Sequence, residues 1–255
     1  MPIVPCFDPT TGASGGPASG GTPPVLCPFY DLPFETVDLT DGTWTLLDPD
    51  SLIDTVTFDG THNIIVWNAL GTGSGDYIWT DTNNRAPRWY KLLTINGTQV
   101  TSDDMLALGL LLETDDSYTD FNQRAVGGMA VDPTSTVSST IQCVGTVLTR
   151  AGTANQNYGA FTINGQSTGS GATAAKGVGL VQVGGQFLGA SSYHVLDSSN
   201  VRVASGSRPA NATVPAGDDL YLCFGVGTRS SWDTVAAGDD QRIRLGYRAI
   251  KWSIP

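Results

Sequence analysis

The pentapeptide GQSTG, centred on Ser167, is the first pattern in the sequence that could carry chemistry. It matches the G-x-S-x-G pattern of serine hydrolases, and His194 and Asp197 could complete a catalytic set. That chemistry needs the serine on a sharp turn between a strand and a helix. Ser167 instead follows the turn-favouring pair Asn164-Gly165 in a loop of small residues, and the order serine, histidine, aspartate is not that of α/β hydrolases. We therefore predict that Ser167 is not catalytic.

Carboxylates are the second candidate chemistry, because a glycosidase needs two that face each other, one of them with a raised pKa. The sequence has 22 Asp and two Glu, but no spacing singles out a pair. The doubled acids fall where turns or strand starts are expected, which favours solvated turn residues. They are Asp103-Asp104, Asp115-Asp116, Asp218-Asp219 and Asp239-Asp240. We expect no catalytic residues, and a polysaccharide hydrolase is the least favoured function.

Metal and cofactor sites have no recognisable signature. Oxygen-rich loops suit calcium, but no EF-hand pattern is present. His62 and His194 are the only histidines, and no C-x-x-C or H-x-x-x-H spacing occurs. The Gly-rich segments lack the Lys-Ser/Thr ending of a phosphate loop. We predict neither a metal nor a cofactor.

The six Trp and eight Tyr could provide a platform on which sugar rings stack. Trp79, Trp89 and Tyr90 bracket the turn-like segment TDTNNRAPR, so this edge is the candidate glycan-binding site. The alternative is that these aromatic side chains pack in a core or an interface.

From about Val37 to Pro255, the sequence consists of short β-like runs separated by turn signals. These runs would position the candidate residues named above. The predicted strands are Thr43 to Leu47, Leu52 to Phe58, Asn63 to Asn68, Tyr77 to Thr80, Arg88 to Ile95, Ala125 to Val131, Thr140 to Thr149, Tyr158 to Ile163, Val178 to Val183, Ser192 to Leu196, Leu220 to Val226 and Arg242 to Trp252. Asp59-Gly60, Asn96-Gly97 and Asn164-Gly165 favour hairpin turns. This pattern predicts an all-β fold, a β-sandwich of jelly-roll type.

The segment 102–113, SDDMLALGLLLE, is the one serious helix candidate. Its leucines alternate as in a strand, and Gly109 weakens a helix. We favour a buried strand.

The segment QRIRLGYRAIKW alternates cleanly and places Arg242, Arg244 and Arg248 on one face of a strand. We expect a solvated face paired with nearby Asp, and the alternative is a contact with an acidic partner, including a neighbouring copy.

Charge is sparse and acidic, with 15% charged residues and a formal net charge of −11. A protein that neutralises a nucleic-acid backbone needs clustered Lys and Arg, so we expect no nucleic-acid partner. No segment approaches the ~20 apolar residues of a transmembrane helix, so we expect no membrane insertion.

Four cysteines do not make a disulfide framework. Cys143 and Cys223 lie in apolar strand-like runs and are expected to be buried thiols. Cys6 and Cys27 flank a Gly-rich stretch, and whether they pair stays open. The N-terminus MPIVPCFDP lacks the basic and apolar regions of a secretory signal, so we expect synthesis in a reducing cytoplasm.

Residues 1–36 are expected to form an arm that precedes a sandwich domain at 37–255. Residues 1 to about 28 are rich in Gly, Pro, Ser and Thr and should not fold alone. Fully extended, they could reach on the order of 90 Å at ~3.3 Å per residue. Apolar residues in the arm are the predicted anchors on a partner. They are Ile3, Val4, Phe7, Val25, Leu26, Phe29 and Tyr30.

Three phrases, DGTWTLLDPDSLI (41–53), RAPRWYKLL (85–93) and AVDPTSTV (130–137), resemble uncharacterised virion structural proteins of tailed phages that infect marine bacteria and cyanobacteria. They cover about thirty residues of the first half of the body. The resemblance implies a protein assembled in the host cytoplasm, released by lysis and present in many copies on a head or tail. It implies no functional residues.

These observations predict a non-enzymatic virion protein, a surface decoration or fibre subunit that its arm attaches to other capsid or tail proteins. We expect a homo-oligomer, such as a trimer, because closed symmetry is usual in such parts. The alternative is a lectin-like module that binds a host surface glycan or receptor.

Overall fold

The structure of the 255-residue chain is a computed structural model. It describes residues 28–68, 87–114, 123–134, 141–149, 155–162, 172–175, 179–185, 191–196, 202–208, 216–228 and 235–252. The predicted strand at Tyr77 to Thr80 and the Asn164-Gly165 turn lie outside these residues. No helix in the described part of the chain is long and apolar enough to cross a membrane.

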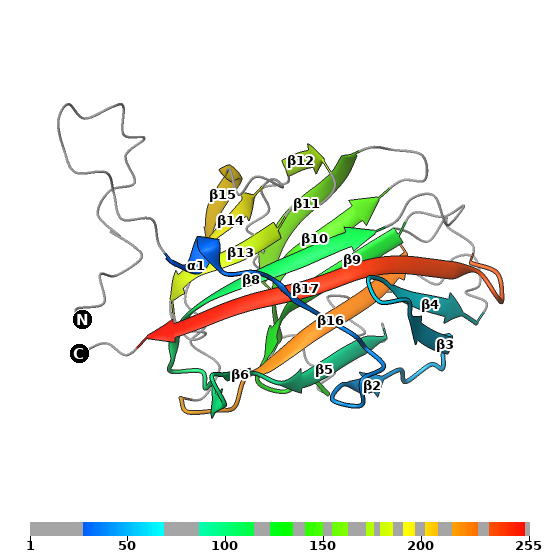
Figure 1. The fold of residues 1–255 in the computed structure, drawn as a ribbon, viewed down its shortest axis with the longest axis horizontal. Helices are drawn as coiled ribbons and strands as arrows, with labels where there is room; N and C mark the ends of the chain where they lie inside the picture. The colour runs from blue at the N-terminus through cyan, green and yellow to red at the C-terminus, as the bar shows by residue number, and fades with distance from the viewer. Residues whose placement is uncertain are drawn as a thin grey trace.

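The fold is all-β and consists of two stacked antiparallel sheets, as the sequence predicts (Figure 1). The first sheet contains β1 (Glu35–Thr36), β3 (Ile53–Phe58), β4 (Asn63–Trp67), β8 (Met105–Thr114), β13 (Gly179–Gly185), β14 (Ser191–Leu196), β15 (Arg202–Arg208) and β17 (Asp240–Trp252). Its order is β15-β14-β13-β8-β17-β4-β3, and β1 also pairs with β17.

The second sheet contains β2 (Thr45–Leu47), β5 (Arg88–Leu92), β9 (Gln123–Ala130), β10 (Ile141–Thr149), β11 (Asn155–Thr162), β12 (Ala172–Ala175) and β16 (Tyr221–Thr228). Its order is β12-β11-β10-β9-β16-β5-β2. Strands far apart in sequence are therefore neighbours in both sheets, which gives the crossed connections of a jelly-roll-like sandwich.

Two small elements complete the fold, a helical turn α1 (Pro28–Asp31) and a hairpin of β6 (Thr94–Ile95) and β7 (Thr98–Gln99). Asn96 and Gly97 form the hairpin turn with φ of 52° and 71°. Positive φ at both central residues is what an Asn-Gly hairpin turn requires, so the sequence signal is confirmed.

The core lies between the two sheets. On β8, Leu106, Leu108, Leu110 and Leu112 are all buried, which confirms the prediction of a buried strand. Phe224 of β16 is fully buried in the same core cluster. The sheets approach so closely at Gly127 that a Cβ there would lie 2.9 Å from Leu110 Cδ1.

The other predicted strands correspond to strands of the structure, with boundaries shifted by a few residues. The predicted run at Arg88 to Ile95 divides into β5 and β6. Four strands were not predicted, namely β1, β7, β12 and β15. The first two have two residues each, and ATAA and RVASGSR lack a strong apolar alternation.

Residues 28–36, which we call the strap, contain α1 and β1 and belong to the predicted arm. Glu35 pairs with Tyr247 and Thr36 with Gly246, so β1 extends the edge of β17 beyond the end of β4. The next backbone N–H, of Val37, donates to the Leu245 carbonyl at 3.0 Å. The chain then passes over β17 towards β2 (Figure 1). The strap therefore packs against the body that the sequence places at 37–255.

Candidate functional site

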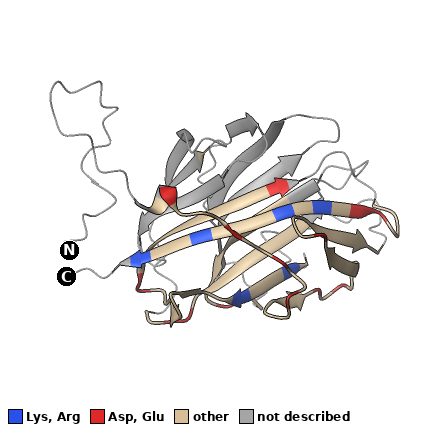
Figure 2. Ribbon diagram, viewed as in Figure 1, with Lys and Arg blue, Asp and Glu red and all other residues tan. Residues whose placement is uncertain are grey.

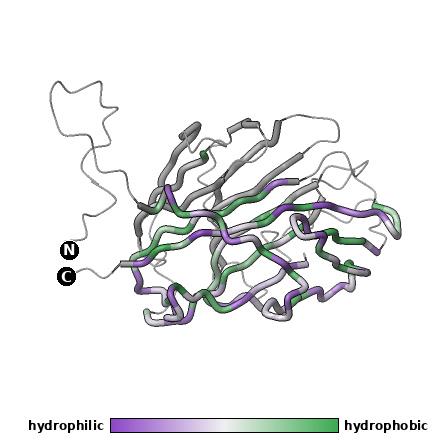
Figure 3. The backbone as a smooth tube through the Cα atoms, viewed as in Figure 1, coloured by the Kyte–Doolittle hydropathy of each residue, from purple (hydrophilic) through white to green (hydrophobic). Residues whose placement is uncertain are grey.

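Arg248 joins the strap to β17. Hydrophilic and hydrophobic stretches follow one another along β17 (Figure 3), and the alternation of the sequence predicts a solvated arginine at position 248. The residue is nevertheless only 3% exposed. Its guanidinium carbon lies 4.4 Å from the centroid of the Phe34 ring and 5.1 Å from that of Phe29. Its Nη1 donates to the Leu32 carbonyl at 3.0 Å. The expectation of a solvated face is wrong for Arg248, because the strap covers it.

Two glycines make room for the strap. A Cβ at Gly109 of β8 would lie 2.9 Å from Arg248 Cγ and 3.3 Å from Phe29 Cζ. A Cβ at Gly246 of β17 would lie 3.0 Å from the Glu35 carbonyl oxygen. Side chains at either position would push the strap or Arg248 away. Together with Arg248 and the edge of β17, these glycines form what we call the strap seat.

The predicted arm anchors fall into two groups. Ile3, Val4, Phe7, Val25 and Leu26 lie outside the described residues, and Tyr30 lies on α1. Phe29 is fully buried and contacts Arg248 of its own chain. Phe29 is therefore buried in the body, against Arg248. The anchor role of the other residues stays a prediction.

A mixed cluster around Lys91 joins β5 of the second sheet to β17 of the first. Lys91 Nζ lies 4.6 Å from the Trp44 ring centroid and 4.9 Å from that of Tyr247. The Tyr247 hydroxyl donates a hydrogen bond to Glu35 of the strap. Burial lowers the pKa of Lys91, and nearby Asp41 and Glu35 oppose that shift. Lys91 thus holds the strap and the following loop to the second sheet.

Burial also raises the pKa of Tyr247, and the hydrogen bond to Glu35 adds to the shift because it favours the neutral phenol. Asp41 lies in a turn, where the Thr43 N–H and hydroxyl both donate to its Oδ1 at 2.7 Å and lower its pKa. The phenol is neutral and the carboxylate is ionised at neutral pH. The cluster can therefore bind the strap by polar contacts.

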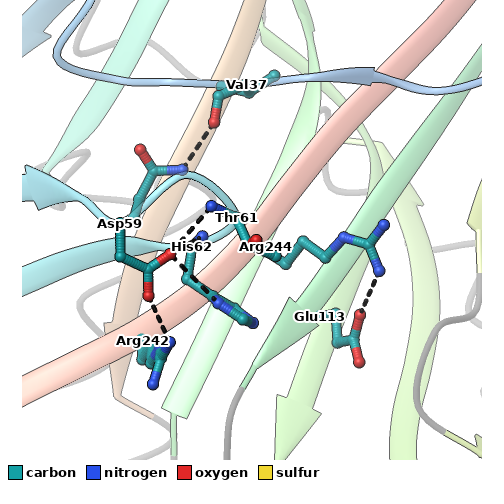
Figure 4. A network of polar contacts seen from close by, with 8 residues as sticks. Val37, Asp59, Thr61, His62, Glu113, Arg242 and Arg244 are labelled. Carbon is teal, nitrogen blue, oxygen red and sulfur yellow. Dashed lines mark hydrogen bonds and ion pairs between the residues drawn. The ribbon is translucent and has the colours of Figure 1, made fainter.

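Basic positions recur along β17 (Figure 2). The remaining two arginines of the strand pair with acidic side chains (Figure 4). Arg242 pairs with Asp59 of the β3–β4 hairpin, and Arg244 Nη1 lies 3.6 Å from Glu113 Oε2. The Asp59 carboxylate also accepts the backbone N–H groups of Thr61 and His62 at 2.9 and 2.8 Å. These hydrogen bonds lower the pKa of Asp59 to about 2. The expected pairing with a nearby Asp is confirmed for Arg242, whereas the partner of Arg244 is Glu113.

The predicted glycan platform is not assembled as the sequence suggests. Trp89 is 2% exposed and belongs to the core, so its indole is not available to a sugar ring. Trp79 lies outside the described residues. Tyr90 lies on the other side of β5 and meets Tyr221 of β16 edge to face, with ring centroids 6.0 Å apart. Both tyrosines are half-buried, and neighbouring Leu92 is 37% exposed. Tyr90 and Tyr221 therefore form a half-buried aromatic pair on the side of β5 opposite Trp89.

Several of the other sequence candidates lie outside the residues that the structure describes. Ser167 and Asp197 lie outside the described residues, as do Cys6 and Cys27, and His194 lies on β14. Cys223 is a buried free thiol, as predicted, and Cys143 lies on β10. Within the described ranges, no group of three His, Cys, Asp or Glu side chains could hold a metal ion.

Sequence reasoning missed Phe34, Glu35, Lys91 and Tyr221. Phe29 and Phe34 are two aromatic residues five positions apart in PFYDLPFE, a segment that also contains Pro33. This pair was the available signal that the segment packs against the body. No sequence signal pairs Lys91 with Tyr247, because 156 positions separate them (247 − 91 = 156) and only the fold brings them together.

No protein-family model matches the sequence, and no curated protein sequence is similar to it. Several solved structures are similar in shape. An endo-1,3-β-glucanase from Streptomyces sioyaensis matches with a TM-score of 0.44 and 11% identity, over 93% of this chain and 99% of that one.

The CBM2 module of the evolved Dit of Lactobacillus casei BL23 phage J-1 has a TM-score of 0.43 and 8% identity, and covers 83% of this chain and 91% of its own. A legume lectin-like domain from Entamoeba histolytica has a TM-score of 0.39 and 6% identity, with 83% and 91% covered.

Proposed function

We propose that this chain is a non-enzymatic structural protein of a phage virion, a surface decoration or fibre subunit that is attached to the particle through residues 1–27. The resemblance of three sequence phrases to phage virion proteins suggests the setting. The strap carries the proposal, because it continues the predicted arm and is fastened to β17 by Arg248. The predicted arm therefore continues into a segment that is held on the first sheet.

A deletion that ends before the strap tests this proposal. Removal of residues 2–27 leaves Phe29, Phe34 and Glu35 in place, so the body should keep its fold. The gene of the encoding phage is deleted, and either the full chain or the 2–27 deletion is supplied from a plasmid during infection. Immunoblots of purified particles should detect the full chain and lose the truncated one.

A full-length variant tests the apolar anchors separately from the length of the arm. In this variant, Ile3, Val4, Phe7, Val25 and Leu26 are all replaced by Ser. It keeps the length of the arm and removes only its apolar anchors. It should be lost from particles as well. Normal incorporation of the truncated chain would show that the arm is not the attachment.

The proposal also makes the chain a binding protein and not an enzyme. A polysaccharide hydrolase would release reducing ends from host-envelope glycans, with two carboxylates about 5 to 10 Å apart. Sustained release that an Asp-to-Asn change abolishes would contradict a purely structural role.

A second candidate function is glycan or receptor binding on the outer face of the second sheet. The observation that favours it is the half-buried pair Tyr90 and Tyr221 beside exposed Leu92. Aromatic rings with one apolar face and a polar tip are suited to stack on sugar rings.

A glycan array with the full chain tests this candidate. Y90A and Y221A should each reduce binding of any retained glycan at least about tenfold if each ring contributes about 1.4 kcal/mol or more. L46A removes another exposed apolar side chain and should leave binding unchanged. Binding that survives loss of both tyrosines would place the site elsewhere.

A further inference from the structure

We propose that Asn96 is a modification site, at which the folded chain loses the side-chain amide without an enzyme and forms aspartate and isoaspartate. The reacting groups are the Asn96 side chain, the backbone nitrogen of Gly97 and water. The proposal does not depend on a virion role, because it rests on the turn between β6 and β7.

The turn supplies both groups that the first step needs. The Gly97 amide nitrogen attacks Cγ of Asn96, so that a C–N bond closes a five-membered ring. The side-chain nitrogen leaves as ammonia and takes the proton of the Gly97 N–H. Water then adds to one of the two ring carbonyls and opens the ring, which gives aspartate or isoaspartate. No electrons are transferred, and water is the co-reactant.

Both reacting groups are accessible in the folded chain. Asn96 and Gly97 are exposed, with φ of 52° and 71°. Within the part of the chain that the structure describes, neither the Asn96 side chain nor the Gly97 N–H takes part in a hydrogen bond. A Cβ at Gly97 would meet no atom within 4 Å beyond its chain neighbours, so the ring has room to form.

The hairpin that carries the turn is small. β6 and β7 form a separate two-stranded sheet with two residue pairs. A hairpin of this kind is marginally stable by itself, so it opens locally and gives the backbone the freedom that ring closure requires. Its base is fixed, because the Val100 N–H donates to the Leu93 carbonyl at 2.9 Å and both residues are buried. The modification should therefore disrupt the hairpin and leave the two large sheets in place.

The β3–β4 turn also contains a residue that precedes glycine, and there the side chain is held. Asp59 Oδ1 accepts the N–H groups of Thr61 and His62 at 2.9 and 2.8 Å. The carbonyl oxygen of an asparagine can accept the same two hydrogen bonds. Asp59→Asn therefore creates a second Asn-Gly pair in the same molecule, with a side chain that is less free to reach the Gly60 nitrogen.

Two natural asparagines serve as internal references. Asn63 and Asn68 each donate a hydrogen bond from Nδ2 to a backbone carbonyl, at 2.8 and 2.7 Å. Neither of them precedes a glycine, so a side chain crowds the attacking nitrogen. We expect both to stay intact in the folded chain.

The full chain and its Asp59→Asn variant are incubated in mildly alkaline buffer made with water enriched in heavy oxygen. Each protein is kept folded in one sample and unfolded in guanidinium chloride in another, and circular dichroism verifies the two states. Every ring that water opens during the incubation gains one oxygen label, which separates it from deamidation during later digestion in ordinary water. Peptide mapping by mass spectrometry measures the label at each asparagine, and isoaspartyl methyltransferase detects isoaspartate.

The folded chain should gain label and isoaspartate at Asn96, and not at Asn63 or Asn68. In the folded variant, position 96 should react at least about tenfold faster than position 59, because two hydrogen bonds together contribute about that factor. The two positions should react at similar rates when unfolded. An intact Asn96 in the folded chain, over a time in which the unfolded chain reacts there, would overturn the proposal. Equal rates at positions 59 and 96 in the folded variant would contradict its structural basis, the free side chain.

Discussion

The guanidinium carbon of Arg248 lies 4.4 Å from the centroid of the Phe34 ring, so a basic residue of the last strand is covered by a segment near the start of the chain. A cation over an aromatic face that is removed from water is stabilised more strongly than one at the surface. The contact makes the strap part of the body and fixes the place where the arm leaves it.

Replacement of Arg248 by Ala should free the strap. The change removes a charged hydrogen bond to Leu32 and the contacts with two rings, and we expect a loss of about 2–4 kcal/mol in the free energy of unfolding. Urea denaturation measures the loss, and hydrogen exchange should show faster exchange in residues 28–37.

Replacement of Arg244 by Ala is the matched control on the same face of β17. Its side chain is 47% exposed and pairs with Glu113 at 3.6 Å, so the loss should stay below about 1 kcal/mol. Equal losses in the two variants would argue against the strap contact.

Gly109→Ala should displace the strap without removing any charge. The new methyl group would lie 2.9 Å from Arg248 Cγ, and we expect a loss of about 1–3 kcal/mol together with faster exchange in the strap. Gly97→Ala strains the β6–β7 turn, where φ is 71°, and should lower stability without a selective effect on the strap. An unchanged strap in Gly109→Ala would show that the seat tolerates a side chain.

Asp59→Asn should change how the stability of the fold varies with pH in the acidic range. The pKa of Asp59 in the folded chain is about 2, below the ~3.9 of an unfolded Asp, so ionised Asp59 stabilises the fold above pH ~4. That contribution is lost as the pH falls from ~4 to ~2. The difference in urea midpoint between wild type and D59N should therefore be constant above pH ~4 and shrink below it. Asp54→Asn, at an exposed position on β3, is the control, and a difference that does not vary with pH would refute the role of Asp59.

Cys223 should resist thiol reagents in the folded protein. Burial raises the pKa of this thiol, and the residue is 0% exposed. In a variant with Cys6, Cys27 and Cys143 replaced by Ser, a chromogenic disulfide reagent should react only after unfolding in guanidinium chloride. Rapid reaction under native conditions would mean that the second sheet opens at β16.

Several features of the fold were readable from local sequence because their cause is local. The alternation of Leu106, Leu108, Leu110 and Leu112 predicted a buried strand, and Asn96-Gly97 predicted its hairpin turn. The pairing of Arg242 with Asp59 also followed from strand alternation and a surface rich in Asp.

The errors arose where long-range packing overrides local pattern. Trp89 and Tyr90 are adjacent in sequence, but their side chains lie on opposite faces of β5. The Trp89 side chain is in the core, and the Tyr90 ring contacts Tyr221. Arg248 follows the same surface pattern as Arg244, and it is buried because the strap crosses it. Phe29 lies in a stretch whose composition predicts an arm, and it is nevertheless a core residue.

The sequence by itself determined the all-β class, the positions of most described strands, the hairpin turns at Asp59-Gly60 and Asn96-Gly97, and the alternation of β17, because side-chain period and turn chemistry act over a few residues. Only the tertiary structure decided that residues 28–36 belong to the body, that Arg248 is their partner and that Lys91 meets Tyr247. These contacts join residues more than 150 positions apart (248 − 34 = 214 and 247 − 91 = 156). Their energy comes from the removal of charged and aromatic groups from water, which depends on what the rest of the chain brings to cover them.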